Sequence, residues 1–207
     1  MDWKRIAQNN ILYNNPVLTH AFGICTIVAA ATTLQNGFIL AVLFAVMCIP
    51  TCAVSSLFYR RLARPYRAAA AVVTAAVFYT IGVMALRAVY GSFSTLFRYY
   101  LPLMVVNSLM FNRAVRYAPR ETVGETIFDS ATAAVGFGAA ACATGLVREF
   151  LLTGNLLGWQ VWRAGDAMHM VQVPFFGFIV LGFVAAGARA LRLRRERRAH
   201  REGRPKP

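Results

Sequence analysis

The sequence predicts an all-α membrane protein with six transmembrane helices, arranged as two inverted three-helix repeats in which the first helix is short or broken. Three observations lead to this fold class. Hydrophobic residues make up 58% of the 207 residues, charged residues make up only 14%, and the charges fall in a few short stretches. A soluble domain of this composition could not cover its surface with polar groups, so a helical bundle in lipid is the better explanation.

Six apolar runs have about the length that a helix needs to cross a hydrocarbon layer, which is roughly 20 residues. Each run is expected to be helical, because in lipid every backbone group needs an internal partner. The runs define a membrane domain over residues 16–191, between an amino-terminal cytoplasmic segment (1–15) and a basic cytoplasmic tail (192–207). Their predicted bounds are Pro16–Leu34, Phe38–Tyr59, Ala68–Tyr90, Leu96–Phe111, Thr126–Phe150 and Val171–Leu191.

The distribution of positive charge predicts that both ends of the chain lie in the cytoplasm. With the amino terminus inside, all but four of the 22 Lys and Arg residues fall on the cytoplasmic side; the four are Arg87, Arg98, Arg148 and Arg163. This bias follows the positive-inside rule. The net charge of +14 therefore indicates topology and contact of the tail with anionic lipid, and no nucleic-acid partner is expected.

Dividing the chain near Tyr90 gives two halves of three predicted helices. An odd number of crossings per half turns the second half upside down relative to the first. The first helix of each half is also irregular: one passes through Gly23, and the other contains Pro102 and Asn107. Such interruptions at corresponding positions of two repeats point to a functional site near the bilayer midplane.

Several blocks of sequence resemble the E subunit of the Rnf electron-transport complex and its relative, the D subunit of the sodium-pumping quinone reductase. Residues 14–25 (NNPVLTHAFGIC) follow that family's pattern of Asn-Asn-Pro, six residues, and Gly-Leu/Ile-Cys. Residues 101–114 (LPLMVVNSLMFNRA) resemble its Pro-Leu-Ile-Val-Val-Asn-Cys block. Further similar blocks are 128–138 (FDSATAAVGFG), 147–158 (VREFLLTGNLLG) and 174–182 (PFFGFIVLG).

The resemblance implies a six-helix subunit of the bacterial inner membrane that pairs with a homologous inverted subunit. Each of the two would supply two ligands to a shared [2Fe–2S] cluster. Other subunits, including ones that carry flavin, would complete an ion-translocating oxidoreductase that moves sodium or protons. The chain would help to carry electrons across the membrane and would have no enzymatic activity by itself.

The resemblance places the first cluster ligand at Cys25 and the second at Ser108, where relatives have a cysteine. A serine hydroxyl is a poor ligand compared with a thiolate, so three alternatives stay open. Three cysteines and Ser108 hold the cluster; a nearby cysteine such as Cys48 or Cys52 substitutes; or the cluster is absent. In the last case the chain is a redox-inactive structural or ion-conducting protein.

Asp129 is the main candidate for an ion pathway. It lies near the predicted cytoplasmic start of the fifth helix. Ionisable groups at membrane depth are costly and tend to mark routes for ions. A role at the helix end or interface is the alternative for this carboxylate.

Overall fold

The computed structural model describes Val17, Thr19, residues 21–91, Phe93, and residues 95–153, 155–156, 159–160 and 173–201. These residues are helical apart from turns, loops and one short antiparallel pair, β1 (Asn155–Leu156) with β2 (Trp159–Gln160). The long helices are α4 (Leu34–Phe58), α5 (Arg64–Tyr90), α8 (Val123–Thr153) and α9 (Pro174–Arg201). The short ones are α3 (Ile24–Ala30), α6 (Thr95–Tyr100) and α7 (Ser108–Asn112).

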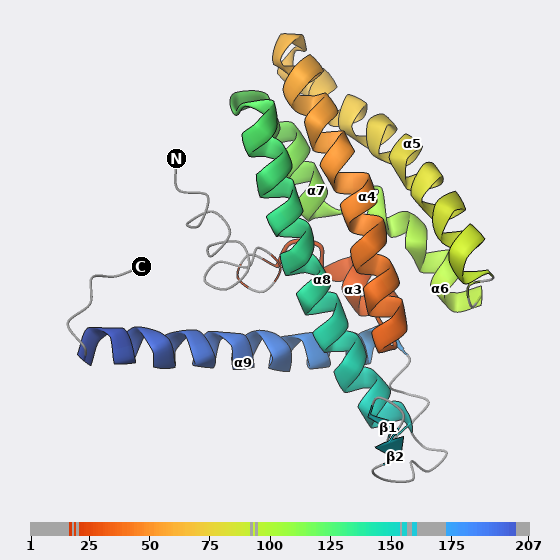
Figure 1. Cartoon of the computed structure of the whole chain (residues 1–207), viewed down its shortest axis with the longest axis vertical. Helices are drawn as coiled ribbons and strands as arrows, with labels where there is room; N and C mark the ends of the chain where they lie inside the picture. The colour runs from red at the N-terminus through yellow and green to blue at the C-terminus, as the bar shows by residue number, and fades with distance from the viewer. Residues whose placement is uncertain are drawn as a thin grey trace.

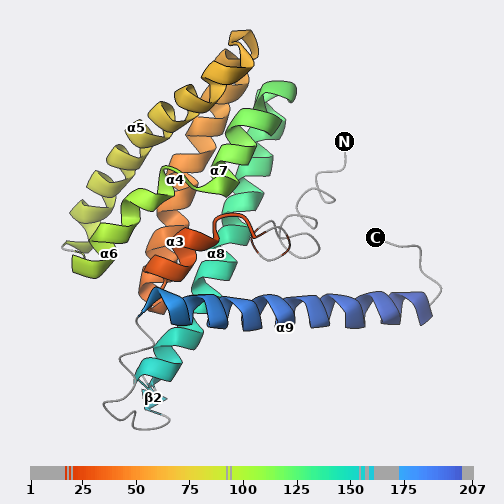
Figure 2. The same ribbon diagram turned by 180° about the vertical axis from the view of Figure 1, so that it is seen from behind.

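Three described helices are long and apolar enough to cross a membrane: Leu34–Phe58, Pro65–Tyr90 and Val123–Leu152. They confirm the second, third and fifth predicted segments. α4 lies between α5 and α8, and the three run side by side (Figures 1 and 2). The rings of Phe44 and Phe137 stack between α4 and α8, with centroids 4.3 Å apart. α5 is the least buried of the three and turns large apolar side chains outward, as a lipid-facing helix does.

Local signals explain where the long helices begin. The side chain of Thr33 caps α4 by accepting a hydrogen bond from the Asn36 N–H at 3.2 Å. Pro65 occupies the first turn of α5, where a missing N–H costs nothing. Thr122 and Glu125 form a reciprocal capping box at the start of α8.

The first and fourth predicted segments are short or broken, as expected. α3 has only seven residues and is separated from α4 by a break at residues 31–33. The fourth segment is divided into α6, a 3₁₀ turn at Leu101–Met104, and α7. Pro102 lies in that turn, and the Asn107 side chain caps α7 by accepting from the Leu109 N–H at 2.9 Å. A π-helical turn (Arg113–Tyr117) and a second 3₁₀ turn lead from α7 to α8.

The sixth predicted segment differs most from expectation. Its apolar part, Pro174–Ala190, is shorter than the three crossing helices, and α9 lies across the bundle instead of along it (Figures 1 and 2). The helix also continues to Arg201, past the predicted start of the basic tail at residue 192. The described chain is therefore a three-helix bundle with two interrupted segments and one transverse helix, and six crossings are not seen in it.

Candidate functional site

The two interrupted segments meet at a polar junction. The Gly23 N–H donates a hydrogen bond to Ser108 Oγ at 2.8 Å, although the two residues are 85 positions apart. The Asn107 side-chain amide donates to Thr26 Oγ1 at 3.3 Å. Asn107 and Thr26 are buried. Since buried polar groups need partners, these hydrogen bonds connect the start of α3 to the start of α7.

Glycine is required at position 23 for two reasons. Its φ of +77° lies in the left-handed region, which side chains other than glycine rarely adopt. A Cβ atom there would also lie 2.9 Å from Asn107 Oδ1. The glycine therefore lets α3 begin in close contact with the capping residue of α7.

The junction brings together the two positions that the sequence marked as cluster ligands. Ser108 contacts Gly23 directly, and Cys25 follows Gly23 by two residues. Cys25 and Ser108 are both exposed, whereas Thr26 and Asn107 beside them are buried. The thiol and the hydroxyl thus lie on an accessible side of the junction, where a second polypeptide could approach.

The chemistry of these two groups fits half of a [2Fe–2S] site. Such a cluster takes four protein ligands, and thiolates are the usual ones. Cys25 offers a thiol and Ser108 a weaker oxygen donor. Among the residues that the structure describes, no group of three or more His, Cys, Asp or Glu residues could hold a metal ion. Any complete cluster site would therefore need ligands from outside the described part of this chain.

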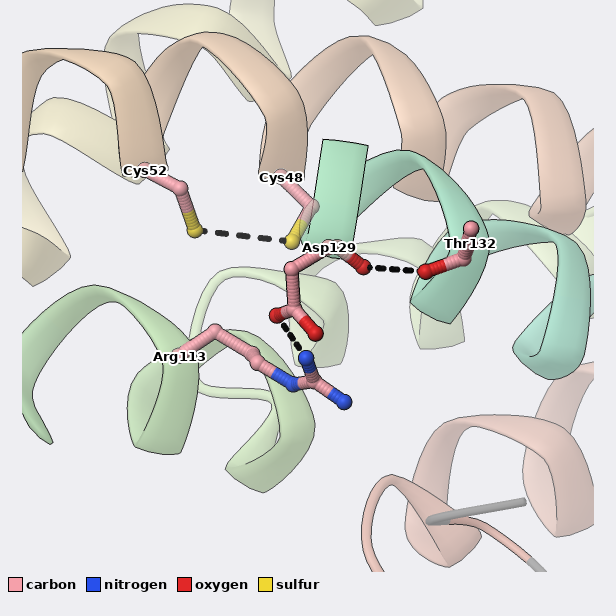
Figure 3. A network of polar contacts seen from close by, with 5 residues as sticks. All are labelled: Cys48, Cys52, Arg113, Asp129 and Thr132. Atoms are coloured by element: carbon pink, nitrogen blue, oxygen red, sulfur yellow. Dashed lines mark hydrogen bonds and ion pairs between the residues drawn. The ribbon is translucent and has the colours of Figure 1, made fainter. Parts of the chain in front are cut away.

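Cys48 and Cys52 form a separate pair on α4. Their sulfur atoms are 3.9 Å apart and both residues are fully buried. Figure 3 shows the two thiols beside the side chains of Asp129 and Arg113. The spacing of four residues does place both cysteines on one face, as the sequence indicates. They lie one turn apart on the side of α4 that packs against α8, in a different polar network from the junction of α3 and α7.

Asp129 is buried, with 4% of its surface exposed, and forms an ion pair with Arg113 (Figure 3). Arg113 belongs to the π-helical turn after α7, so the pair links that turn to α8. The hydroxyls of Thr126 and Ser130, which flank Asp129 in the sequence of α8, are buried, and that of Thr126 makes no hydrogen bond with the residues described. The sequence predicts Asp129 as a candidate site residue, whereas Arg113 counts there only as one of several basic residues on the cytoplasmic side.

From the sequence, Arg148 and Glu149 are expected to pair with each other or with a neighbouring subunit at the outer face, and the structure shows further partners for both. Arg148 is the largest of the fully buried side chains among the described residues. Its guanidinium donates a hydrogen bond to the Val28 carbonyl at 2.7 Å. Glu149 accepts one from the Leu34 N–H at 2.7 Å. Both residues lie on α8 and bind the backbone on either side of the break between α3 and α4.

Comparison with known proteins gives the same family over nearly the whole chain. Residues 3–185 match the family described as "Rnf-Nqr subunit, membrane protein". A protein of Shewanella amazonensis is 29% identical over 210 residues, covering 94% of this chain and 90% of its own length. One from Shewanella oneidensis is 27% identical, with coverages of 89% and 86%. One from Pseudoalteromonas atlantica is 25% identical, with coverages of 84% and 75%. All three are named as the E subunit of an ion-translocating oxidoreductase complex.

Proposed function

We propose, since this chain belongs to the Rnf-Nqr family of membrane protein subunits, that it is part of an ion-translocating oxidoreductase complex in the bacterial inner membrane. Relatives that carry that name match it over most of their length. In the complex it helps to carry electrons across the membrane and has no enzymatic activity by itself. Both ends of the chain lie in the cytoplasm, in agreement with the bias of positive charge.

The observation that carries this proposal is the hydrogen bond between Gly23 and Ser108. It joins the two interrupted segments at the positions that the family resemblance assigns to cluster ligands. Cys25 and Ser108 would hold one side of a [2Fe–2S] cluster, and a homologous inverted subunit would hold the other. The cluster, when bound, supplies one-electron transfer within the membrane. The chain itself supplies two ligands and a buried polar frame, made by Thr26 and Asn107, that holds them.

The partner subunit also accounts for the irregular helices. Within the complex the six apolar segments form two inverted three-helix repeats, and the interrupted first helix of each repeat lies beside its counterpart in the partner. The positions of the interruptions support this arrangement, because α3, α6 and α7 are each too short to cross the bilayer alone. Their exposed ends then lie within protein instead of lipid. Other subunits, including flavin-bearing ones, exchange electrons on either side.

Iron analysis and low-temperature EPR of the purified complex test the electron-carrying role. The wild-type complex is expected to contain a cluster signal that Cys25→Ser removes. Ser108→Cys is expected to keep the signal and change its g-values and potential, because a thiolate replaces an oxygen ligand. Cys142→Ala is the matched control, since Cys142 lies on α8 beside Thr33 and Leu34, at the opposite end of α3 from the junction. No such signal in either the wild type or Ser108→Cys would overturn the electron-carrying role.

The second candidate is a redox-inactive structural or ion-conducting protein, and the same hydrogen bond favours it. Ser108 Oγ already accepts from the Gly23 N–H, a role that a hydroxyl performs without any metal. In this case a complex that lacks the membrane cluster would remain active, and Ser108→Ala would affect its assembly rather than its redox spectrum. The EPR experiment separates the two candidates.

We further propose that Asp129 lies on the ion pathway. Asp129 is a buried carboxylate, and the buried hydroxyl of Thr126, three residues before it on α8, has unused hydrogen-bonding capacity, so oxygen ligands for a hard cation or water are at hand. Arg113 would pair with the carboxylate whenever no cation occupies the site. Asp129→Asn is expected to weaken the dependence of turnover on sodium or on proton concentration, while Thr132→Val, a neighbouring change, leaves it intact. An unchanged ion dependence in Asp129→Asn would contradict this role.

A further inference from the structure

The side chain of Arg148 is a buried cation that binds backbone carbonyls from two other parts of the chain. Its Nη1 donates to the carbonyls of Val28 at 2.7 Å and Ala31 at 3.4 Å, and its Nη2 donates to that of Val173 at 3.4 Å. None of its surface is exposed. Burial of a guanidinium is costly without such partners, so these bonds hold it in one place.

The first two carbonyls belong to the end of α3. The last carbonyl groups of a helix have no partner within the helix and carry partial negative charge, which a cation stabilises. Arg148 therefore caps the carboxyl end of α3 from α8. Glu149, the next residue, accepts from the Leu34 N–H at 2.7 Å and so binds the first turn of α4. Two consecutive residues of α8 thus hold both sides of the break between α3 and α4.

The first turn of α9 packs against the same hydrogen bonds. A Cβ atom at Gly177 would lie 2.7 Å from the Val28 carbonyl oxygen and 3.0 Å from Arg148 Nη1. Glycine at this position therefore leaves room for the hydrogen bond between Arg148 and Val28. The structure brings α3 and α9 into contact, and Gly177 lies where they meet.

α3 is consequently held at both ends. Its beginning is bound to Ser108 through the Gly23 N–H, and its end is bound to Arg148. We propose that Arg148 is a positioning residue, which sets the distance between Cys25 and Ser108 by holding the far end of the helix that carries Cys25. The consequence for a cluster rests on the proposed function, whereas the positioning itself is a property of the chain and can be measured without iron.

The test measures cross-linking between Cys25 and a cysteine introduced by Ser108→Cys. The full chain is purified free of iron, with Cys142→Ala to remove the half-buried thiol; Cys48 and Cys52 are fully buried. Bifunctional thiol reagents of increasing spacer length report the distance between the two sulfur atoms in the folded, monodisperse fraction. In the parent the shortest spacers are expected to react fastest.

Arg148→Met is expected to slow the shortest reagent by about tenfold and to shift the preference to longer spacers, because cross-linking depends steeply on geometry. Thr144→Val is the matched control. Thr144 is fully buried one turn away on α8 and bonds within its own helix, so its replacement should leave the preference unchanged. Gly177→Ala crowds the guanidinium without removing it and serves as the milder variant if Arg148→Met does not fold.

A spacer preference that is unchanged in Arg148→Met, or in Gly177→Ala where the first variant fails to fold, overturns the positioning role. A general loss of stability would lower the folded fraction without moving the preference within it. EPR of the assembled complex then separates the two proposals. Absence of a cluster signal in the parent complex would refute the proposed electron-carrying function and leave the cross-linking result standing. A signal that is present, with cross-linking insensitive to Arg148, would refute this inference alone.

Discussion

Replacement of Gly145 by alanine tests how closely α8 packs against the break between α3 and α4. A Cβ atom at this position would lie 2.4 Å from the Thr33 carbonyl oxygen, 2.8 Å from the Thr33 carbonyl carbon and 3.3 Å from the Leu34 nitrogen. All three are backbone atoms, so no side chain can rotate away. To restore ordinary contact, α8 and the break would have to separate by roughly 1 Å.

The break is poorly able to move. The Thr33 side chain caps α4, and Glu149 on α8 binds the Leu34 N–H. Overpacking of this kind costs about 1–3 kcal/mol, and contact with backbone favours the upper end of that range. Alanine gains back up to about 1 kcal/mol of helix propensity over glycine. We therefore expect the Gly145→Ala variant to lose about 2 kcal/mol of unfolding free energy.

The assay is unfolding of the purified chain in mixed micelles by a denaturing detergent, followed by circular dichroism. Gly182→Ala is the control, because a Cβ at Gly182 in α9 meets no atom within 4 Å. It should be neutral or slightly stabilising. If Gly145→Ala is as stable as Gly182→Ala, then α8 does not approach the break as closely as the structure indicates, and the reasoning about α3 being held there is wrong.

Three further predictions use the same unfolding assay. Arg113→Met leaves the buried carboxylate of Asp129 without its ion-pair partner and should lower the unfolding free energy by about 3–5 kcal/mol. The double variant Arg113→Met, Asp129→Leu should be close to wild type in stability. Additive effects of the two changes would contradict a coupled pair. Thr122→Ala removes the side-chain cap of α8 and should cost about 0.5–2 kcal/mol, with faster hydrogen exchange in the first turn; unchanged exchange would argue against the cap. A hydrogen bond with Glu125 raises the pKa of Glu121 above its ordinary value, so the protonated Glu121 contributes stability at low pH that is lost as the pH rises through the raised pKa. Glu121→Gln should flatten this dependence of the unfolding free energy on pH. An identical pH profile in the variant would refute the role of Glu121.

Much of the bundle could be predicted from hydropathy. α4, α5 and α8 begin and end within a few residues of the predicted bounds, because a long apolar run has only one stable conformation in lipid. The interruptions were also predictable. Gly23 and Pro102 favour breaks in a helix, and the structure has a break at each.

The transverse course of α9 could not be predicted in this way. Its apolar part has the composition of a membrane helix, and hydropathy carries no information on direction. α9 packs against α3, and the Val173 carbonyl just before it accepts a hydrogen bond from Arg148, so contacts with distant parts of the chain fix where it leaves the bundle. Composition also could not separate the basic tail from the helix, since Arg is a good helix former and α9 continues to Arg201.

By itself, the sequence determined that this is a helical membrane protein of one family, with two interrupted segments that carry Cys25 and Ser108. The tertiary structure alone decided that those segments touch through Gly23, and that Arg148 turns inward to bind the end of α3. The physical reason is that hydropathy and helix signals act over neighbouring residues. A buried cation or a hydroxyl, by contrast, is stabilised by partners from distant parts of the chain, which only packing brings together.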